Sequence, residues 1–323
     1  MTNLRAGVIG VGYLGRFHAE KYAGCKGVKL VGVADSDGAR AREAGAKLRC
    51  KAFFDYRELL PHVDLVSIAV PTESHHAVAR AAIEAGVHLL LEKPVTRTLA
   101  EADALVSLAR ERQLRFGAGH LERFNPAFRA LEKQLDRPLF IDCERLSGFT
   151  QRGTDVDVVL DLMIHDLDLV LAMVKSEPVS VSACGFSVLT GSIDIANARL
   201  EFADGCVANL SASRVSQTPV RKLRVFQADL YISADLQAAK LRAVRKAPDA
   251  MRTVESESNF DGADALRAEV EAFVGAVRDE RDPPVTGEDG RRALALALEV
   301  GQRVRERLTQ YASARGRLMQ AAQ

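Results

Sequence analysis

The chain has few cysteines, little net charge and no long apolar run, and each of these absences argues against a class of protein. Its five cysteines are scattered, without a C-x-x-C pair or the spacing of metal ligands: Cys25, Cys50, Cys143, Cys184 and Cys206. This pattern predicts reduced thiols rather than a disulfide framework or a zinc site. The 44 basic and 43 acidic side chains nearly balance, which argues against nucleic acid or an anionic membrane surface as a partner.

No segment of the sequence has the length of a membrane-spanning helix. The longest apolar stretch in a helix-like region is LVLAMV at 169–174, which is far too short to cross a bilayer. A basic and then apolar leader is also absent, because Gly10 interrupts the first apolar run. We therefore expect a soluble, cytoplasmic protein. Its 323 residues exceed the size of most single hydrophobic cores, so two domains are expected.

Residues 1–120 alternate short apolar runs with segments that have the composition and spacing of helices. The apolar runs lie at 6–11, 29–36, 64–70 and 88–94. Continuous apolar strands that alternate with helices predict βαβ units. We therefore expect an α/β N-terminal Rossmann domain, built on a doubly wound parallel sheet.

Residues 121–323 follow a different pattern. One strongly apolar helix, at about 155–174, precedes a series of short strands between about 179 and 234. This order predicts an α+β domain with an open, mostly antiparallel sheet. We expect this domain to serve in substrate binding and oligomerisation. The most polar stretch, at 240–260, is expected to be a flexible loop.

Two further helices are predicted at about 264–280 and 288–308. We expect the first of them to cover part of the antiparallel sheet, together with the apolar helix that precedes the strands. Two helices do not cover a broad sheet completely, and an exposed face with a residual apolar patch is typical of a subunit contact. The sequence therefore predicts a homodimer, or a homotetramer built from such dimers.

The segment GVIGVGYLGRFHA, which starts at residue 7, carries the glycines Gly10, Gly12 and Gly15. A predicted strand precedes these glycines and a predicted helix follows them. In this context Gly10 permits a sharp turn, and Gly12 lets the backbone approach a pyrophosphate. Gly15 lets the helix pack closely on the strand, with its N-terminal N–H groups facing the phosphates. The segment predicts a dinucleotide site, and a turn without a phosphate is the alternative.

A second predicted strand ends at Asp35, twenty residues after Gly15. A carboxylate at this position can accept hydrogen bonds from the adenosine ribose, and its charge opposes a 2′-phosphate. NAD is therefore the expected cofactor. Arg40 and Arg42 lie close by in the sequence and keep NADP open as the less favoured alternative.

The tripeptide Glu92-Lys93-Pro94 ends another predicted strand. Open α/β sheets bind ligands at the carboxyl ends of their strands, and Lys93 could there lower the pKa of a substrate hydroxyl. An ordinary surface ion pair is the alternative for this lysine.

Asp161, His165 and Asp168 have the spacing i, i+4 and i+7 within the predicted apolar helix, so they share one face. A histidine between carboxylates is suited to general base catalysis, because its pKa lies near neutrality and Asp161 can orient it. A structural histidine in the core is one alternative. Metal binding by Asp161 and His165 is another, which is disfavoured because no second histidine lies at ligand spacing. We expect no metal.

Four motifs occur in a fixed order: G-x-G-x-x-G-x-x-H, P-x-x-x-H from Pro71 to His75, E-K-P, and D-x-x-x-H-x-x-D from Asp161 to Asp168. Together they resemble the glucose–fructose oxidoreductase / inositol dehydrogenase / MocA (Gfo/Idh/MocA) family of NAD(P)-dependent sugar oxidoreductases, over nearly the whole chain. The resemblance implies that Lys93 and His165 are the catalytic pair and that Asp161 is the partner of His165. The cofactor contacts implied are Gly10, Gly12, Tyr13, Leu14, Gly15, Asp35, Pro71, Thr72, His75, Glu92 and Lys93.

A narrower resemblance comes from the segments 119–131, 152–169 and 193–216. They are similar to family members that act on sugar nucleotides, and imply oxidation of the 3-hydroxyl of UDP-N-acetylglucosamine in the lipid A precursor pathway. The substrate contacts implied are Lys93, His120, Glu122, Arg123, Asn125, Arg152, Asp161 and His165. Another sugar, a UDP-sugar uronic acid or inositol is the alternative substrate, and a non-catalytic NAD-binding sensor is the alternative function.

Overall fold

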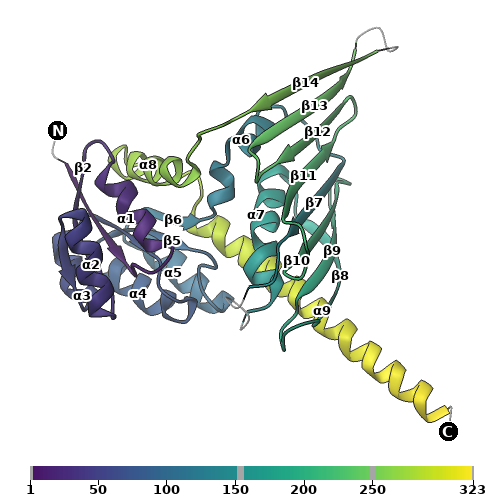
Figure 1. The fold of residues 1–323 in the computed structure, drawn as a ribbon, viewed down its shortest axis with the longest axis horizontal. Coiled ribbons are helices and arrows are strands. Elements are labelled where there is room, and N and C mark those ends of the chain that lie inside the picture. Colours follow the sequence, from purple (N-terminus) through teal and green to yellow (C-terminus); the bar gives the residue numbers. More distant parts are fainter. Residues whose placement is uncertain (1–2, 151–155, 248–251, 322–323) are drawn as a thin grey trace. The chain divides into compact units, whose positions relative to one another are not determined.

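The computed structural model describes residues 3–150, 156–247 and 252–321, which form two compact units (Figure 1). Unit 1 contains the described residues of Met1–Phe124 together with Asp264–Leu294. Unit 2 contains those of Asn125–Ala263 and of Ala295–Gln323. Within the described residues, no helix combines the length and the apolar character needed to cross a membrane.

Unit 1 is built on six parallel strands in the order β3-β2-β1-β4-β5-β6. This arrangement confirms the predicted doubly wound sheet. Strands β3 and β6, of three and four residues, were not among the predicted strands. The strands are β1 (Leu4–Ile9), β2 (Val28–Ala34), β3 (Lys51–Phe53), β4 (Leu65–Ile68), β5 (His88–Glu92) and β6 (Phe116–Gly119).

The helices of unit 1 cover this sheet, and α8 is one of them. Val270, Phe273, Val274 and Val277 of α8 lie in the same buried core as Tyr22, so the prediction that this helix covers the second sheet is wrong. Figure 1 shows α8 beside α1, both in unit 1. The helices are α1 (Gly15–Ala23), α2 (Gly38–Leu48), α3 (Tyr56–Leu59), α4 (Thr72–Glu84), α5 (Leu99–Glu111) and α8 (Ala265–Arg278), with the 3₁₀ turns η1 (Leu60–His62) and η2 (Leu121–Phe124).

Unit 2 contains an eight-stranded sheet in the order β14-β13-β12-β11-β7-β10-β9-β8. Only β7 and β10 pair in parallel among its described strands, which confirms the mostly antiparallel prediction. The strands are β7 (Phe140–Leu146), β8 (Pro178–Phe186), β9 (Ile195–Phe202), β10 (Val207–Ser213), β11 (Val220–Phe226), β12 (Leu230–Asp235), β13 (Lys240–Lys246) and β14 (Thr253–Asn259).

The stretch at 240–260 is not a flexible loop where the structure describes it, because β13 and β14 form there. Leu241 and Ala243 of β13 are buried, while Arg242 pairs across the strands with Glu255 at 2.9 Å. All seven residues of β14 are exposed, so this edge strand carries no apolar alternation. A strand held by backbone pairing and an exposed ion pair has the polarity of a loop, which explains the wrong prediction.

The helices of unit 2 lie on one face of its sheet. Both α6 and α7 contact strands of this sheet and lie on the same side of it in Figure 1. The predicted helix at 155–174 consists of a π-helical turn followed by an α-helix, and residues 151–155 lie outside the described part. Helix α9 begins within unit 1 and continues into unit 2, well past the predicted end at 308. These elements are α6 (Pro126–Glu132), η3 (Val159–Met163), α7 (Ile164–Met173) and α9 (Gly287–Ala321).

Candidate cofactor and catalytic sites

The glycine turn after β1 has the geometry of a dinucleotide-binding loop. Gly10 has φ +83°, and a Cβ on Gly15 would lie 1.7 Å from the Gly10 carbonyl oxygen, so the turn itself requires both glycines. Among the described residues, a Cβ on Gly12 would meet Arg40 Nη1 alone, at an ordinary 3.7 Å. Packing within the chain therefore does not require glycine at this position, whereas close approach of a phosphate would. No side chain in the described part of the chain caps the start of α1, which fits a helix N-terminus that receives an anion.

Asp35 lies directly beside this loop. Its carboxylate accepts hydrogen bonds from the N–H of Val11 at 2.9 Å and of Asp37 at 2.8 Å. Arg40 Nη2 is 3.7 Å from Asp35 Oδ1, and the Arg40 side chain is about half exposed. A carboxylate offers about four lone-pair positions, so Asp35 can hold the loop and still accept a hydrogen bond from a ribose. Arg40 places a cation at the same point.

The other predicted cofactor contacts of the loops differ in exposure. Tyr13 is 60% exposed and Leu14 41%, so both are accessible to a ligand held by the loop. The Tyr13 ring packs edge-on against Phe17 at 5.5 Å between centroids. Pro71 is exposed and Thr72 is half-buried, at the turn from β4 into α4.

His75 lies beneath the Lys93–Pro94 turn, in the interior of unit 1. It is 1% exposed, with Nδ1 2.8 Å from the Pro94 carbonyl and Nε2 2.9 Å from the Val70 carbonyl. Burial lowers the pKa of His75, although the two carbonyls act in the opposite direction, and a neutral imidazole donates to only one of them. His75 therefore joins the end of β4 to the turn that carries the half-buried Lys93.

A line of buried hydrogen bonds ends on Glu92, directly before Lys93. Tyr22 Oη is 2.9 Å from Ser67 Oγ, His18 Nδ1 is 3.1 Å from Ser67 Oγ, and His18 Nε2 is 2.9 Å from Glu92 Oε1. With a neutral imidazole, Tyr22 donates to Ser67, Ser67 to His18, and His18 to the carboxylate. Of this line, the sequence motifs contained His18 and Glu92; Tyr22 and Ser67 gave no signal.

The helix that carries Asp161 and His165 belongs to unit 2 and starts with the π turn η3. Such turns interrupt helices frequently at functional sites. Asp161 and His165 are half-buried, whereas Asp166 and Asp168 are 4% and 2% exposed. Asp168 thus differs in environment from the two residues with which it shares the predicted spacing.

Two features of unit 2 fix this helix. Arg145 of β7 donates from Nε and Nη2 to the two carboxylate oxygens of Asp166, each at 2.8 Å. Asp157 caps the start of the helix, because its Oδ1 accepts from the N–H of Val159 at 3.1 Å and of Leu160 at 3.0 Å. The buried bidentate pair sets the rotation of the helix that presents His165.

The loop between β8 and β9 is closed around Asp194. Asp194 Oδ2 accepts from the N–H of Val188, Leu189 and Thr190 at 2.7–2.9 Å, and Oδ1 accepts from the Thr190 hydroxyl at 2.6 Å. Burial by itself would raise the pKa of Asp194, but these hydrogen bonds outweigh it and hold the pKa well below its usual range. Asp194 is therefore ionised at neutral pH.

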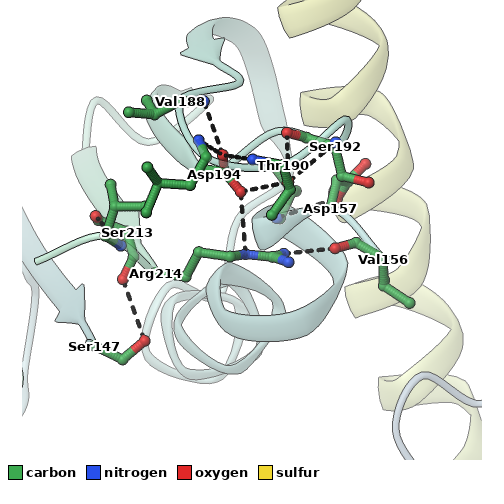
Figure 2. Close-up of polar contacts among 12 residues, drawn as sticks. Ser147, Val156, Asp157, Val188, Thr190, Ser192, Asp194, Ser213 and Arg214 are labelled. Atoms are coloured by element: carbon green, nitrogen blue, oxygen red, sulfur yellow. Dashed lines mark hydrogen bonds and ion pairs between the residues drawn. The ribbon is translucent and has the colours of Figure 1, made fainter. Parts of the chain in front are cut away.

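Arg214 connects this carboxylate to the segment that leads into η3 and α7. Figure 2 shows its guanidinium between Asp194 and Val156, with Nε 3.9 Å from Asp194 Oδ1 and Nη2 donating to the Val156 carbonyl. The N–H of Val158 also donates to the Ile193 carbonyl at 2.9 Å. The buried pair Asp194–Arg214 thus anchors the residues directly before η3. Sequence reasoning missed it, because residues 156, 194 and 214 have no local pattern in common.

The predicted substrate contacts do not all lie in one unit. His120, Glu122 and Arg123 lie in unit 1, where His120 and Glu122 are buried. Asn125 lies in unit 2, where its side chain caps α6 at Ala127 and donates to the Leu236 carbonyl at 2.8 Å. Arg152 lies outside the described residues. Lys93 is described within unit 1, and Asp161 and His165 within unit 2.

Comparisons with protein families match both parts of the chain. Residues 4–120 match an oxidoreductase family with an NAD-binding Rossmann fold, and residues 129–229 match the GFO/IDH/MocA C-terminal domain.

Individual proteins extend these matches along nearly the whole chain. The UDP-N-acetylglucosamine 3-dehydrogenase of Acidithiobacillus ferrooxidans is 44% identical over 305 residues, which cover 93% of this chain and 97% of that protein. A solved structure of that enzyme covers 94% of this chain and 98% of its own, with a TM-score of 0.89. An inositol 2-dehydrogenase of Rhizobium meliloti is 26% identical and covers 91% of this chain and 94% of that protein. Levoglucosan dehydrogenase in complex with NADH shares the fold, with a TM-score of 0.86 at 18% identity over 94% of this chain and 98% of its own.

Proposed function

We propose that this chain, which belongs to the Gfo/Idh/MocA family of NAD-binding oxidoreductases, oxidises the 3-hydroxyl of UDP-N-acetylglucosamine. The product is the 3-keto sugar nucleotide. One observation carries the proposal: 44% identity, over nearly the full length of both chains, to a dehydrogenase named for this reaction. The glycine turn supports the binding of a dinucleotide cofactor. Packing does not explain the glycine at position 12, whereas close approach of a phosphate does.

The reaction requires that a proton leave the hydroxyl while a hydride leaves C3. NAD, when bound, supplies the acceptor for that hydride. In the proposal, His165 accepts the proton from the 3-hydroxyl, and Asp161 orients its imidazole and stabilises the imidazolium. The ammonium of Lys93 lowers the pKa of the hydroxyl by stabilising the developing negative charge on oxygen. These roles follow from the family resemblance, and each residue is presented at a half-buried position of its own unit.

The substrate is tested with purified protein, NAD and a panel of UDP-N-acetylglucosamine, its uronic acid analogue, UDP-glucose and myo-inositol. We expect the highest kcat/KM with UDP-N-acetylglucosamine, measured as the rise in NADH absorbance. Arg123 and Arg152 are the proposed diphosphate contacts, and the uronic acid would need another cation near C6. A higher kcat/KM with the uronic acid would overturn the proposed substrate but not the dehydrogenase activity. NAD binding without turnover of any substrate would favour the alternative function, a non-catalytic NAD-binding sensor.

Two finer statements belong to the same proposal: the reaction takes place in the cytoplasm, and its product enters the lipid A precursor pathway. The first is supported by the cysteines, none of which forms a disulfide in the described residues. The second rests on the sugar-nucleotide resemblance.

We propose that the protein binds NAD more tightly than NADP. Asp35→Ser is expected to reduce this difference in affinity. The substitution removes the charge that opposes a 2′-phosphate and leaves Arg40, 3.7 Å away in the wild type, to attract one. The measurement is the ratio of the two dissociation constants, because loss of the Asp35 hydrogen bond to the Val11 N–H weakens both cofactors. Asp55→Ser, at an exposed helix cap, is the control. Wild-type protein that binds NADP as tightly as NAD would contradict the role of Asp35.

The assembly is proposed to be a homodimer or a homotetramer that pairs through the outer face of the unit 2 sheet. On this face, the ring of Phe226 lies 5.6 Å from that of Phe140 and 4.9 Å from that of Tyr231. Phe226→Asp is expected to shift the mass from light scattering toward the monomer, because a charge would then be buried in a symmetric contact. Val254→Asp, at an exposed position of the edge strand β14, is the control. A monomeric wild type at micromolar concentration would contradict this assembly.

A further inference from the structure

A second buried carboxyl group, on Glu269 of α8, lies beside Glu92 and His18. Glu269 is 1% exposed, and neither of its carboxylate oxygens has a hydrogen-bond partner among the described residues. One of these oxygens, a Glu92 oxygen and a ring nitrogen of His18 all lie within 4.8 Å of one another. Leu90, Phe124 and Phe273 line a small cavity together with Glu269.

Two carboxylates this close in an apolar interior do not both ionise at neutral pH. Burial raises the pKa of Glu269 well above its usual value, and the charge of Glu92 raises it further. Burial by itself would also raise the pKa of Glu92, but the hydrogen bond from His18 and the charge of Lys93 lower it overall. The proton of the pair therefore resides on Glu269, and Glu92 is the anion.

The elements that pack against α8 carry charged groups besides His18 and Glu92. Helix α8 packs against α1 and η2, and it shares a buried core with Leu90 of β5. Lys21 is neutralised there by Asp264, at 2.7 Å. The titratable groups on these elements are Arg16, His18, Glu20, Lys21 and Tyr22 of α1, His88 and Glu92 of β5, and Glu122 and Arg123 of η2.

We propose that Glu269 is a positioning residue of the dehydrogenase, whose neutral carboxyl group keeps a single negative charge, that of Glu92, next to Lys93. A second negative charge here would stabilise the protonated form of Lys93, the side chain that is proposed to act on the substrate hydroxyl. The proposal rests on the proposed function only for the role of Lys93. The protonation of Glu269 is a separate property that can be measured without substrate.

The first test is infrared difference spectroscopy of Glu269→Gln against wild type at pH 7. Wild type is expected to show the carbonyl band of a protonated carboxylic acid, and Glu269→Gln to lack it. Glu271→Gln, an exposed residue one position past Val270 on the same helix, is the control and should retain the band.

The second test is the thermal midpoint as a function of pH. The pKa of Glu269 is raised in the folded state, so the folded chain keeps a proton that the unfolded chain releases above about pH 4. Wild type then loses up to about tenfold in its folding equilibrium constant per pH unit, until the folded-state pKa is reached. Glutamine has no proton to lose, so the thermal midpoint of Glu269→Gln should rise relative to that of wild type from pH 5 to pH 8. The thermal midpoint of Glu271→Gln should change with pH in parallel with that of wild type.

The third test is the pH profile of kcat/KM, which a purely structural role would not move. At pH 7, Glu269→Gln should remain within about twofold of wild type, because it mimics the neutral acid. At alkaline pH only wild type gains the second charge, so the alkaline limb of Glu269→Gln should lie about half a pH unit lower.

Three results would overturn the proposal: an unchanged infrared band, parallel stability curves for Glu269→Gln and wild type, or superimposed pH profiles. Added Zn²⁺ that stabilises wild type but not Glu269→Gln would also overturn it, because the cluster would then hold a cation rather than a proton. If no substrate turns over, the proposed function fails while the infrared and stability tests still decide the protonation of Glu269.

Discussion

Replacing Lys93 by methionine, or His165 by asparagine, is expected to lower kcat by about 10²–10⁴-fold, the usual contribution of a general acid or base. Both side chains are proposed to act on the substrate hydroxyl, so the dissociation constant of NAD should change far less than kcat. Neither variant should lose much stability, since both positions are only half-buried. The measurements are steady-state kinetics with UDP-N-acetylglucosamine and calorimetric titration with NAD.

The matched controls are Lys47→Met and His62→Asn, at exposed positions of unit 1. Both should keep kcat within about twofold of wild type. Asp161→Asn should fall between the controls and His165→Asn, because it alters the charge beside the histidine without removing the base. Near-normal turnover by His165→Asn across neutral pH would assign the base to another group.

Asp194→Ala is expected to lower the free energy of unfolding by about 3–5 kcal/mol, the usual cost of removing one partner of a buried charge pair. The substitution removes the Asp194 charge from beside the Arg214 guanidinium, which is 6% exposed, and it removes the acceptor of three backbone N–H groups. Because Arg214 also holds the Val156 carbonyl before η3, kcat should fall as well. Urea unfolding at pH 7 and steady-state kinetics measure the two effects.

The control is the exposed pair Asp229–Arg245, whose side chains approach to 2.9 Å at 56% and 50% exposure. Asp229→Ala should lower the free energy of unfolding by less than about 1 kcal/mol. If Asp194→Ala does not fold, Asp194→Asn keeps the acceptor oxygen and should lose less stability. Equal losses for Asp194→Ala and Asp229→Ala would contradict the anchoring role.

The stabilising effect of Asp194 should depend on pH. Its pKa is lowered in the folded state, so its contribution is present above the unfolded value of about 3.9 and is lost as the pH falls through the folded value. The difference in stability between wild type and Asp194→Ala should therefore be constant near neutrality and shrink below about pH 4.

Sequence patterns predicted the features that depend on neighbouring residues. The apolar runs gave the parallel sheet of unit 1, and Gly10 and Gly15 show the positive φ and the close backbone approach that their motif requires. Patterns failed where long-range packing decides the structure. The apolar face of α8 is equally suited to either sheet, and only the folded chain shows that it packs beside Tyr22 in unit 1.

The buried polar groups of the sites were also beyond local patterns. Glu269 lies 177 positions from Glu92 in the sequence, and a charged residue in an amphipathic helix normally predicts a solvent-exposed face. Arg214 and Asp194 lie in a strand-rich segment where alternation predicts exposure of every second residue. In each case the environment that gives the residue its charge state is formed only by tertiary contacts.

The proposed reaction is tested most directly with UDP-N-acetylglucosamine that carries deuterium at C3. Because the hydride is proposed to leave C3, the deuterium should appear in the reduced nicotinamide, detected by mass spectrometry, and kcat/KM should fall where hydride transfer limits the rate. The unlabelled substrate should give the same 3-keto product with unlabelled NADH. Reduced cofactor without deuterium would place the oxidation at another carbon, and contradict the proposed 3-dehydrogenase reaction.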